Sequence, residues 1–110
     1  MDRDERANPL AVEIRQEMIG TYFAGCKRMV ASLEALKAFD RAGYSRRDEE
    51  QKMRRSELFE AAVERVHFVV IQREAMKMSG WEKFFEDYEI PAEVRAQMGR
   101  PKLRHRSVWR

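Results

Sequence analysis

The chain has 110 residues, which is enough for one domain and too few for two. Hydrophobic residues make up 44% of the sequence, an ordinary share for a globular protein, so wholesale disorder is excluded despite the 37% of charged residues. The lone Cys26 excludes an internal disulfide framework and indicates a reducing compartment. No secretory signal and no apolar run of membrane-spanning length is visible. These features predict a soluble, cytoplasmic protein that makes no contact with a membrane.

Charge is unevenly distributed along the chain. The formal net charge is +3, but the last eleven residues hold five cations and no Asp or Glu, which leaves residues 1–99 at a net charge of −2. We therefore predict a single helical domain over residues 1–99 and a basic tail over residues 100–110.

A first long helix is predicted over residues 9–42. Asn8 can cap its free amides, Pro9 suits the first helical position, and Gly43 suits the left-handed conformation that ends many helices. Between these signals the apolar residues recur at steps of three and four, which is typical of a helix with a buried face. The main seam comprises Ile19, Tyr22, Cys26, Met29, Leu33 and Leu36. A second apolar row comprises Phe23, Val30 and Phe39, together with Ile14 and Met18.

Gly20 is the weak point of this helix, because a glycine costs about 1 kcal/mol relative to alanine inside a helix. Two interpretations are open at this stage. Either the helix kinks at Gly20, or the spacing Gly20-x-x-x-Ala24 lets a neighbouring backbone approach closely.

A second long helix is predicted to run to about Met78. Ser45 and Asp48 have the spacing of a capping box at its start. Its apolar row, again at three-and-four spacing, comprises Phe59, Ala62, Val63, Val66, Val69, Val70 and Met76. The β-branched patch over residues 66–71 is compatible with a strand, but no turn signal bounds it, so we predict helix throughout.

Two short helices are predicted to follow. Ser79 stands three residues before Glu82, a capping-box spacing that opens the third helix. One side of this helix is aromatic and comprises Trp81, Phe84, Phe85 and Tyr88. Pro91 starts the fourth helix, and Gly99 ends it. The predicted fold class is therefore all-α, with a long antiparallel helical hairpin followed by two short helices.

The predicted helices are too long for a compact monomer. The first one would span about 50 Å, whereas a globule of this chain length has a diameter nearer 35 Å. Its second apolar row would remain in water, which monomers rarely tolerate. We therefore predict a homodimer with a core like that of a four-helix bundle, formed by two hairpins or by two chains that exchange terminal helices. The predicted interface consists of Ile19, Tyr22, Phe23, Cys26, Met29, Val30, Leu33, Val66 and Val70.

The leading functional hypothesis is a non-enzymatic homodimer with an interaction or scaffolding role, without a cofactor or a small-molecule substrate. The sequence has no glycine-rich phosphate loop, no Ser/His/Asp arrangement and no zinc-ligand spacing. Cys26 lies inside the apolar seam without a basic partner, which is typical of a buried, inert thiol.

An alternative hypothesis is a di-metal (iron) site. Glu64 and His67 form a Glu-x-x-His motif, which places a carboxylate and an imidazole on one helix face, and di-iron bundles add a Glu from the facing helix. Glu34 can supply that carboxylate. The arrangement resembles encapsulated ferritins, whose short two-helix subunits would repeat the motif across a dimer. The competing interpretation is a solvated row formed by Glu57, Glu60, Glu64 and His67.

A second alternative is a nucleic-acid accessory protein that acts through the basic tail. Its cations are Arg100, Lys102, Arg104, Arg106 and Arg110. Cations can neutralise phosphates, and Trp109 or His105 can stack on a base. The competing interpretation is a tail that docks on acidic helices of its own chain or of the partner chain.

Short fragments spread over most of the chain carry a resemblance to known proteins. They are Asn8-Pro9-Leu10, Leu33-Glu34-Ala35-Leu36, Gln72-Arg73-Glu74-Ala75, the stretch Tyr-Glu-Ile-Pro-Ala-Glu-Val at 88–94, and Met98-Gly99. In these fragments the chain resembles an uncharacterised family of small all-helical bacterial proteins. The resemblance implies a helical fold and no particular activity, and the basic tail lies outside it.

Overall fold

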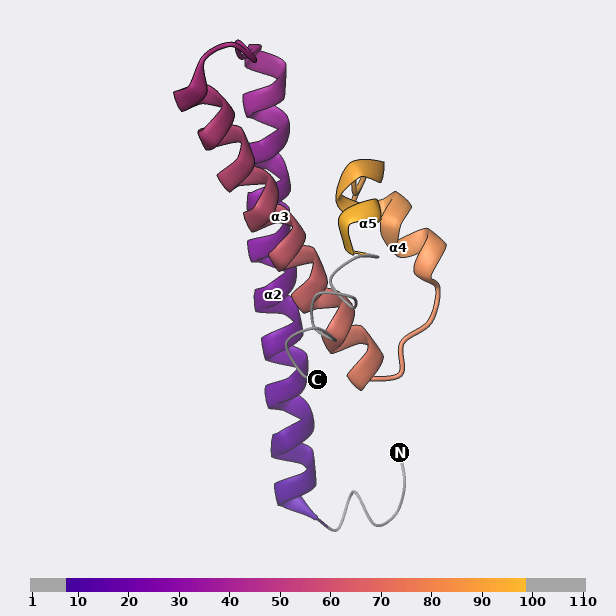
Figure 1. Cartoon of the computed structure of the whole chain (residues 1–110). Coiled ribbons are helices and arrows are strands. Elements are labelled where there is room, and N and C mark those ends of the chain that lie inside the picture. Colours follow the sequence, from indigo (N-terminus) through magenta and orange to yellow (C-terminus); the bar gives the residue numbers. More distant parts are fainter. Residues whose placement is uncertain (1–7, 99–110) are drawn as a thin grey trace, which may run out of the picture.

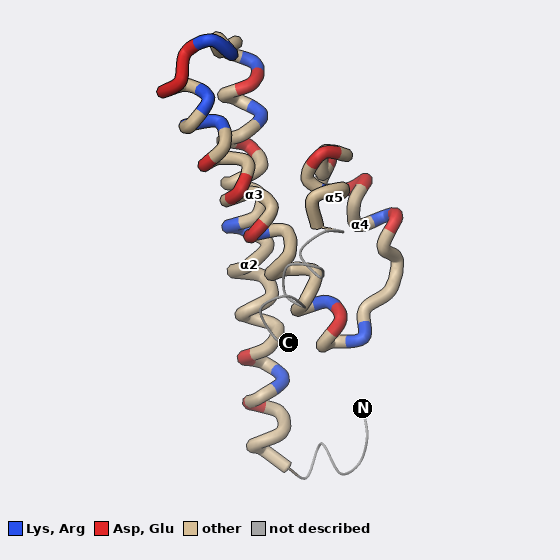
Figure 2. Tube along the Cα trace, in the orientation of Figure 1, with Lys and Arg blue, Asp and Glu red and all other residues tan. Residues whose placement is uncertain are grey.

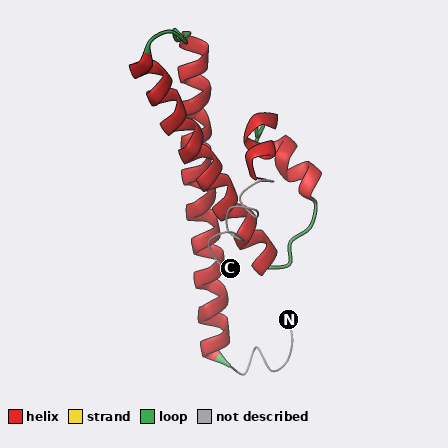
Figure 3. Ribbon diagram, viewed as in Figure 1, coloured by secondary structure: helices red, strands yellow, loops and turns green. Residues whose placement is uncertain are grey.

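The computed structural model describes residues 8–98, and these fold into helices and short connections (Figure 1, Figure 3). The described helices are α2 (Pro9–Ala42), α3 (Glu49–Ala75), α4 (Trp81–Asp87) and α5 (Ala92–Met98). The prediction of an all-helical fold is confirmed. It holds even for the β-branched patch over residues 66–71, which lies inside α3. None of the described helices combines the length and the apolarity needed to cross a bilayer.

α2 begins and ends where the sequence predicts. The side-chain oxygen of Asn8 accepts hydrogen bonds from the backbone N–H groups of Leu10 (3.1 Å) and Ala11 (3.3 Å), which satisfies two of the amides left free at a helix start. Gly43 ends the helix with a φ of 76°, a conformation that only glycine adopts without steric cost. α2 is one continuous helix that includes Gly20, and its ribbon shows no sharp kink along its length (Figure 1).

The start of α3 differs from the prediction. Asp48 is itself the N-cap, and its carboxylate accepts hydrogen bonds from the N–H groups of Glu50 (3.0 Å) and Gln51 (3.3 Å). The Ser45 hydroxyl accepts only from the N–H of Arg47 within the preceding turn. The predicted capping box is therefore wrong. Ser45 was expected to be the cap and Asp48 its partner three residues later, but Asp48 is itself the cap.

The end of α3 also differs from the prediction. α3 stops at Ala75 rather than Met78, because Lys77 takes a left-handed φ of 56°. Glu89 takes the same conformation after α4, with a φ of 49°. After α3, the backbone N–H groups of Lys77 and Met78 donate to the carbonyls of Glu74 and Arg73. After α4, those of Glu89 and Ile90 donate to Glu86 and Phe85 in the same way. This is the pattern of a Schellman motif. Sequence rules reserve this position for glycine, so the end of α3 was predicted about three residues too late.

The start of α4 corrects a further prediction. Gly80, with a left-handed φ of 77°, is the N-cap of α4, and no side chain caps this helix. Ser79 and Glu82 therefore do not form the predicted capping box. Pro91 directly precedes α5, as predicted, and fixes the backbone at the entry to that helix.

The core lies between α2 and α3 and beneath the two short helices. α2 and α3 pack side by side along their length, and α5 packs against α3 (Figure 1). The buried apolar residues are Tyr22, Cys26, Met29, Leu33 and Leu36 from α2; Ala62, Val63, Val66 and Val69 from α3; and Phe84, Ile90 and Val94 near the end of the chain. Most of the seam predicted on the first helix is therefore the inner face of the hairpin.

The molecule is elongated. Its radius of gyration is 17.6 Å and its extents are 62 × 36 × 23 Å, whereas a compact chain of this length has a radius of gyration of about 13 Å. α2 has 34 residues and α3 has 27, so the N-terminal end of α2 projects past the end of α3 (Figure 1). Charged residues crowd around the turn that joins these helices (Figure 2). Most of the exposed large hydrophobic residues lie in α2, namely Leu10, Ile14, Met18, Ile19, Phe23 and Val30, while Met53, Phe68 and Ile71 lie in α3.

Candidate functional site

The nine residues predicted to form a dimer interface fall into two groups. Buried inside the single chain are Tyr22, Cys26, Met29, Leu33 and Val66, and Val70 packs against the same core. Ile19, Phe23 and Val30 are exposed on α2, by 42%, 60% and 41% respectively. The predicted interface is therefore divided by the fold. In this conformation the first group holds the hairpin together, and only the second group is available to another molecule.

We call Ile19, Phe23 and Val30 the outer strip. Their spacings of four and seven residues place them along one edge of α2, since a helix turns about 100° per residue. Gly20 lies beside the strip, and a Cβ atom built on it would meet nothing within 4 Å among the described residues. The close backbone approach considered for Gly20 and Ala24 is thus not made at Gly20 within this chain. The outer strip is an apolar surface that the described chain leaves uncovered.

A groove continues the outer strip toward the N-terminal end of α2. It has a volume of about 540 Å³ and shares Ile19 with the strip. Its lining comprises Ala11, Ile14, Arg15, Met18, Ile19, Met76 and Met78. Methionine side chains are flexible and adapt to irregular partners. The exposed apolar surface of α2 therefore extends from Val30 through Ile19 to Met18 and Ile14 of the groove, which are 37% and 50% exposed.

Arg73 organises the end of the hairpin. It is only 7% exposed, and its guanidinium donates to the Tyr22 hydroxyl (3.1 Å) and to the backbone carbonyl of Ser79. The same group lies 4.6 Å from the ring centre of Phe84 and 5.2 Å from that of Trp81. Arg73 therefore joins α2, α3, the connection after α3, and α4. Its Nε has no hydrogen-bond partner in the described part of the chain.

Arg73 belongs to no recognisable functional motif, but its position in the sequence carries a signal. Arg73 stands seven residues after Val66 and four after Val69, so it continues the buried row of α3. A charged residue on an apolar row indicates a buried polar contact, because an unpaired charge is costly to bury. The aromatic residues of α4 supply part of that contact through their ring faces.

A buried polar cluster of Tyr22, Tyr88 and the Cys26 thiol lies next to Arg73. Burial raises the pKa of Tyr22 above its usual value, although the Arg73 guanidinium opposes this shift. A hydrogen bond with the Cys26 thiol, together with burial, raises the pKa of Tyr88 to about 12. Both phenols therefore remain protonated at neutral pH. Cys26 is a buried free thiol inside the apolar seam.

Arg55 ties both ends of the hairpin turn to α5. It donates to both carboxylate oxygens of Asp40 (3.2 and 3.1 Å) and to both oxygens of Glu93 (2.8 and 3.1 Å). The hydrogen bonds from Arg55 lower the pKa of Glu93 and raise that of Arg55 itself. A second ion pair, Arg95 with Glu82, links α5 to α4. The short helices are therefore held by both apolar and ionic contacts.

The predicted metal ligands are not gathered within one chain. Among residues 8–98, no group of three or more His, Cys, Asp or Glu side chains is arranged to hold a metal ion. Glu64 lies beside Gly25 of α2, at the edge of a small pocket. Glu34 is nine residues from Gly25, about two and a half helical turns, and so lies on the opposite side of α2. With His67 on α3, the three ligands do not converge inside a single copy.

The predicted nucleic-acid contacts lie outside the described residues. Arg100, Lys102, Arg104, Arg106 and Arg110 all belong to the segment 99–110. In the segment 8–98, acidic and basic residues nearly balance, at 16 and 15. This part of the chain has no excess of positive charge that would attract a phosphate backbone.

Comparison with known proteins gives no match: no family model, no curated protein and no solved structure matches this chain. The resemblance to an uncharacterised helical family therefore stays a prediction. The candidate functional surface is defined by geometry, and it is the outer strip of α2 with the groove beside it.

Proposed function

We propose that this protein is a non-enzymatic homodimer with an interaction or scaffolding role, in which α2 of each copy packs against α2 of the other through the outer strip. The observation that carries the proposal is Phe23, which is 60% exposed between Ile19 and Val30. The neighbouring face of α2 is already buried against α3. A helix that is apolar over two adjacent faces is normally buried over both.

A two-fold axis suits this surface. The strip runs from Ile19 to Val30, so an antiparallel α2 pair centred between residues 24 and 25 places Ile19 of one copy opposite Val30 of the second. Phe23 of each copy then lies near Phe23 of the other, close to the axis. Such an interface is isologous, because the same patch serves both copies. Gly20, Ala24 and Ala31 lie beside the strip, and such small residues allow two helices to approach closely.

The magnitudes favour a weak dimer. Burying a large apolar side chain completely contributes about 1.5–3 kcal/mol, and these three residues are about half exposed, so each contributes about 1 kcal/mol. Two copies together gain about 6 kcal/mol from the strip, close to the lower estimates of about 4 kcal/mol for the loss of translational and rotational freedom. The surplus of about 2 kcal/mol corresponds to a dissociation constant above about 1 mM, so association through the strip alone is expected only at high protein concentration.

Sedimentation equilibrium over a wide range of protein concentrations tests this proposal. The full chain is expected to move from the monomer mass of 13.1 kDa toward twice that value as its concentration rises. Phe23→Lys should remain monomeric, because a lysine ammonium group in the pair would have to be desolvated. Met53→Lys is the matched control, since Met53 is 64% exposed on α3 and away from the strip. A full chain that stays at the monomer mass, or a Phe23→Lys variant that associates normally, contradicts the proposal.

A further inference from the structure

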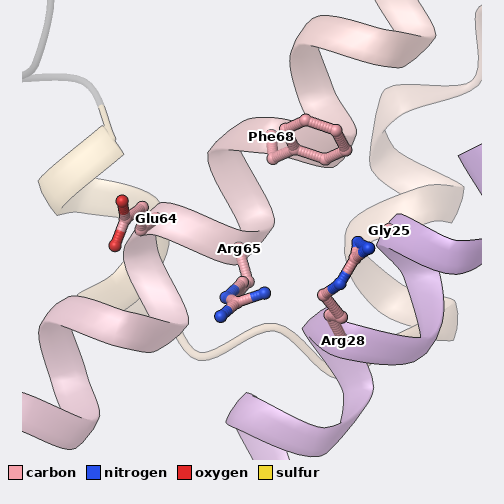
Figure 4. A pocket seen from close by; sticks show the side chains of 5 residues that line it. All are labelled: Gly25, Arg28, Glu64, Arg65 and Phe68. Carbon is pink, nitrogen blue, oxygen red and sulfur yellow. The ribbon is translucent and has the colours of Figure 1, made fainter. Parts of the chain in front are cut away.

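A second surface feature lies on the other flank of α2. It is a pocket of about 210 Å³ between α2 and α3, lined by Gly25, Arg28, Glu64, Arg65 and Phe68 (Figure 4). Arg28 and Val30 are two residues apart and hence about 200° apart around the helix. The pocket is therefore turned away from the outer strip and would stay open in the proposed dimer.

Gly25 and Phe68 build the apolar wall of this pocket. A Cβ atom on Gly25 would lie 3.0 Å from the Cδ1 and Cε1 atoms of the Phe68 ring, so the ring packs directly against the glycine backbone. Phe68 nevertheless remains 40% exposed. Part of an aromatic ring is thus held in a fixed place beside the pocket and is available to a flat ligand group.

Arg28 and Arg65 provide an unbalanced positive charge. Within residues 8–98 neither guanidinium group has an ion pair or a hydrogen bond, in contrast to that of Arg54, which pairs with Glu57 at 3.5 Å. The reason lies in the sequence: no Asp or Glu stands three or four positions from either arginine, so neither can form a pair along its own helix.

The side-chain directions bring these two charges to the same pocket. In Figure 4, Arg65 extends from α3 toward α2, and Arg28 extends along α2 toward Gly25 and the Phe68 ring. The Glu64 carboxylate points away from both guanidinium groups (Figure 4). Two positive charges share this pocket with the single carboxylate of Glu64, so a net positive charge is left, and a bound anion would relieve the repulsion between the two guanidinium groups.

We propose that this pocket binds a phosphate monoester attached to an aromatic ring, with Arg28 and Arg65 on the phosphate and Phe68 against the ring. Guanidinium groups match the oxygen geometry of phosphate through paired hydrogen bonds. The volume is below the 300 Å³ or so of a pocket for a drug-sized ligand, so it accepts one anionic group and one ring but not a whole nucleotide. The ligand class is an aryl phosphate, free or carried as a side chain.

Titration of the full chain with phenyl phosphate, followed by NMR chemical shifts of the backbone amides, tests this inference. We expect saturable shifts around Gly25 and Phe68, with a dissociation constant of about 1 mM or tighter. Arg28→Gln and Arg65→Gln should each weaken binding by about tenfold or more, because each removes charged hydrogen bonds. Glu64→Gln should strengthen binding by about twofold, since it removes a nearby negative charge.

Control ligands and variants separate the parts of the site. Inorganic phosphate should bind about tenfold more weakly than phenyl phosphate because it lacks the ring, and phenol should not bind measurably because it lacks the charge. Arg47→Gln, a charge change in the turn before α3, should leave binding unchanged. Phe23→Lys should also leave it unchanged, because the pocket does not depend on the proposed dimer.

The inference is overturned by any of three results. The first is an absence of saturable shifts. The second is equal affinity of phenyl phosphate for Arg28→Gln, Arg65→Gln and Arg47→Gln, which would indicate non-specific attraction to a basic surface. The third is equal affinity for phenyl phosphate and inorganic phosphate, which would remove Phe68 from the site.

Discussion

α2 carries apolar residues on an inner edge, which faces α3, and on an outer edge, which is the outer strip. The two edges are built from similar residues, but only the inner edge is buried. On the inner edge Met29 is completely buried and Leu33 is 2% exposed, whereas on the outer edge Phe23 is 60% and Val30 is 41% exposed. The difference comes from α3, whose valine row covers one edge only. The comparison teaches that helical periodicity reveals how many apolar rows a helix carries, while the partner of each row depends on the rest of the fold.

The two glycines of α2 repeat this contrast. Gly25 faces the hairpin and is needed there, because the Phe68 ring occupies the space a side chain would take. Gly20 has nothing within 4 Å of its Cβ position among the described residues, so the described chain gives no reason for a glycine there. The proposed second copy along the outer strip would supply such a reason.

The largest expected effect comes from shortening a side chain on the inner edge. Met29→Ala should lower the free energy of unfolding by about 3 kcal/mol, because it leaves a cavity between α2 and α3. Val30→Ala on the outer edge should cost less than about 1 kcal/mol when both are measured by urea unfolding in the monomeric Phe23→Lys background. Equal losses at the two positions would erase the distinction between the edges.

The next effect concerns the residue that joins the hairpin to the short helices. Arg73→Met should lower the free energy of unfolding by about 2 kcal/mol, because it removes the hydrogen bonds to Tyr22 and Ser79 and the contacts with the rings of α4. Urea unfolding followed by tryptophan fluorescence measures this loss. Lys83→Met, at a residue whose side chain is 79% exposed, is the control and should be nearly neutral. An Arg73→Met variant of unchanged stability would show that the buried guanidinium contributes nothing net.

The glycine comparison predicts a smaller effect. In the Phe23→Lys background, Gly20→Ala should raise the free energy of unfolding by about 1 kcal/mol, since helix propensity improves and nothing obstructs the new methyl group. Gly25→Ala should not gain this amount, because the Phe68 ring has to move. Thermal unfolding of both variants decides the matter, and an equal gain at the two sites would contradict the packing of Phe68 on α2.

The smallest effect is a dependence on pH at the α5 contact. The lowered pKa of Glu93 means that its contact with Arg55 contributes stability above the ordinary pKa of 4.5, and that this is lost as the pH falls through the lower pKa of the folded state. Because the Glu93 side chain is 57% exposed and solvent screens the pair, we expect less than about 1 kcal/mol. The free energy of unfolding, measured with urea, should differ less between pH 6 and pH 3 for Glu93→Gln than for the unchanged chain. An identical pH dependence would remove this role from Glu93.

Much of the fold could be predicted from the sequence, for reasons that are local. The Asn8-Pro9 start of α2, its end at Gly43 and the helical nature of residues 66–71 follow from capping chemistry and periodicity. The Schellman motif at Lys77 was missed because it places a non-glycine residue in the left-handed region. Tertiary contact decides this end, through Met78 at the edge of the core.

The candidate sites were less predictable, because they depend on which elements meet. Tyr22 and Phe23 are neighbours in the sequence, but one is buried and the other is exposed. Within one chain Glu34 and Glu64 do not meet, because Glu64 of α3 lies beside Gly25 and Glu34 is on the opposite side of α2, so their convergence across a dimer stays a prediction. No sequence pattern links Arg28 with Arg65, because 37 positions separate them. Only the packing of α2 against α3 brings them to one pocket.

The most direct test of the central claim is an isotope-filtered NOE experiment on a mixture of labelled and unlabelled chains at a concentration where they associate. The account predicts NOEs between chains that connect Phe23 with Phe23 and Ile19 with Val30. NOEs between chains at Met29 and Leu33, which are buried inside each hairpin, would contradict it. An associated mixture without contacts between chains at the outer strip would contradict it as well.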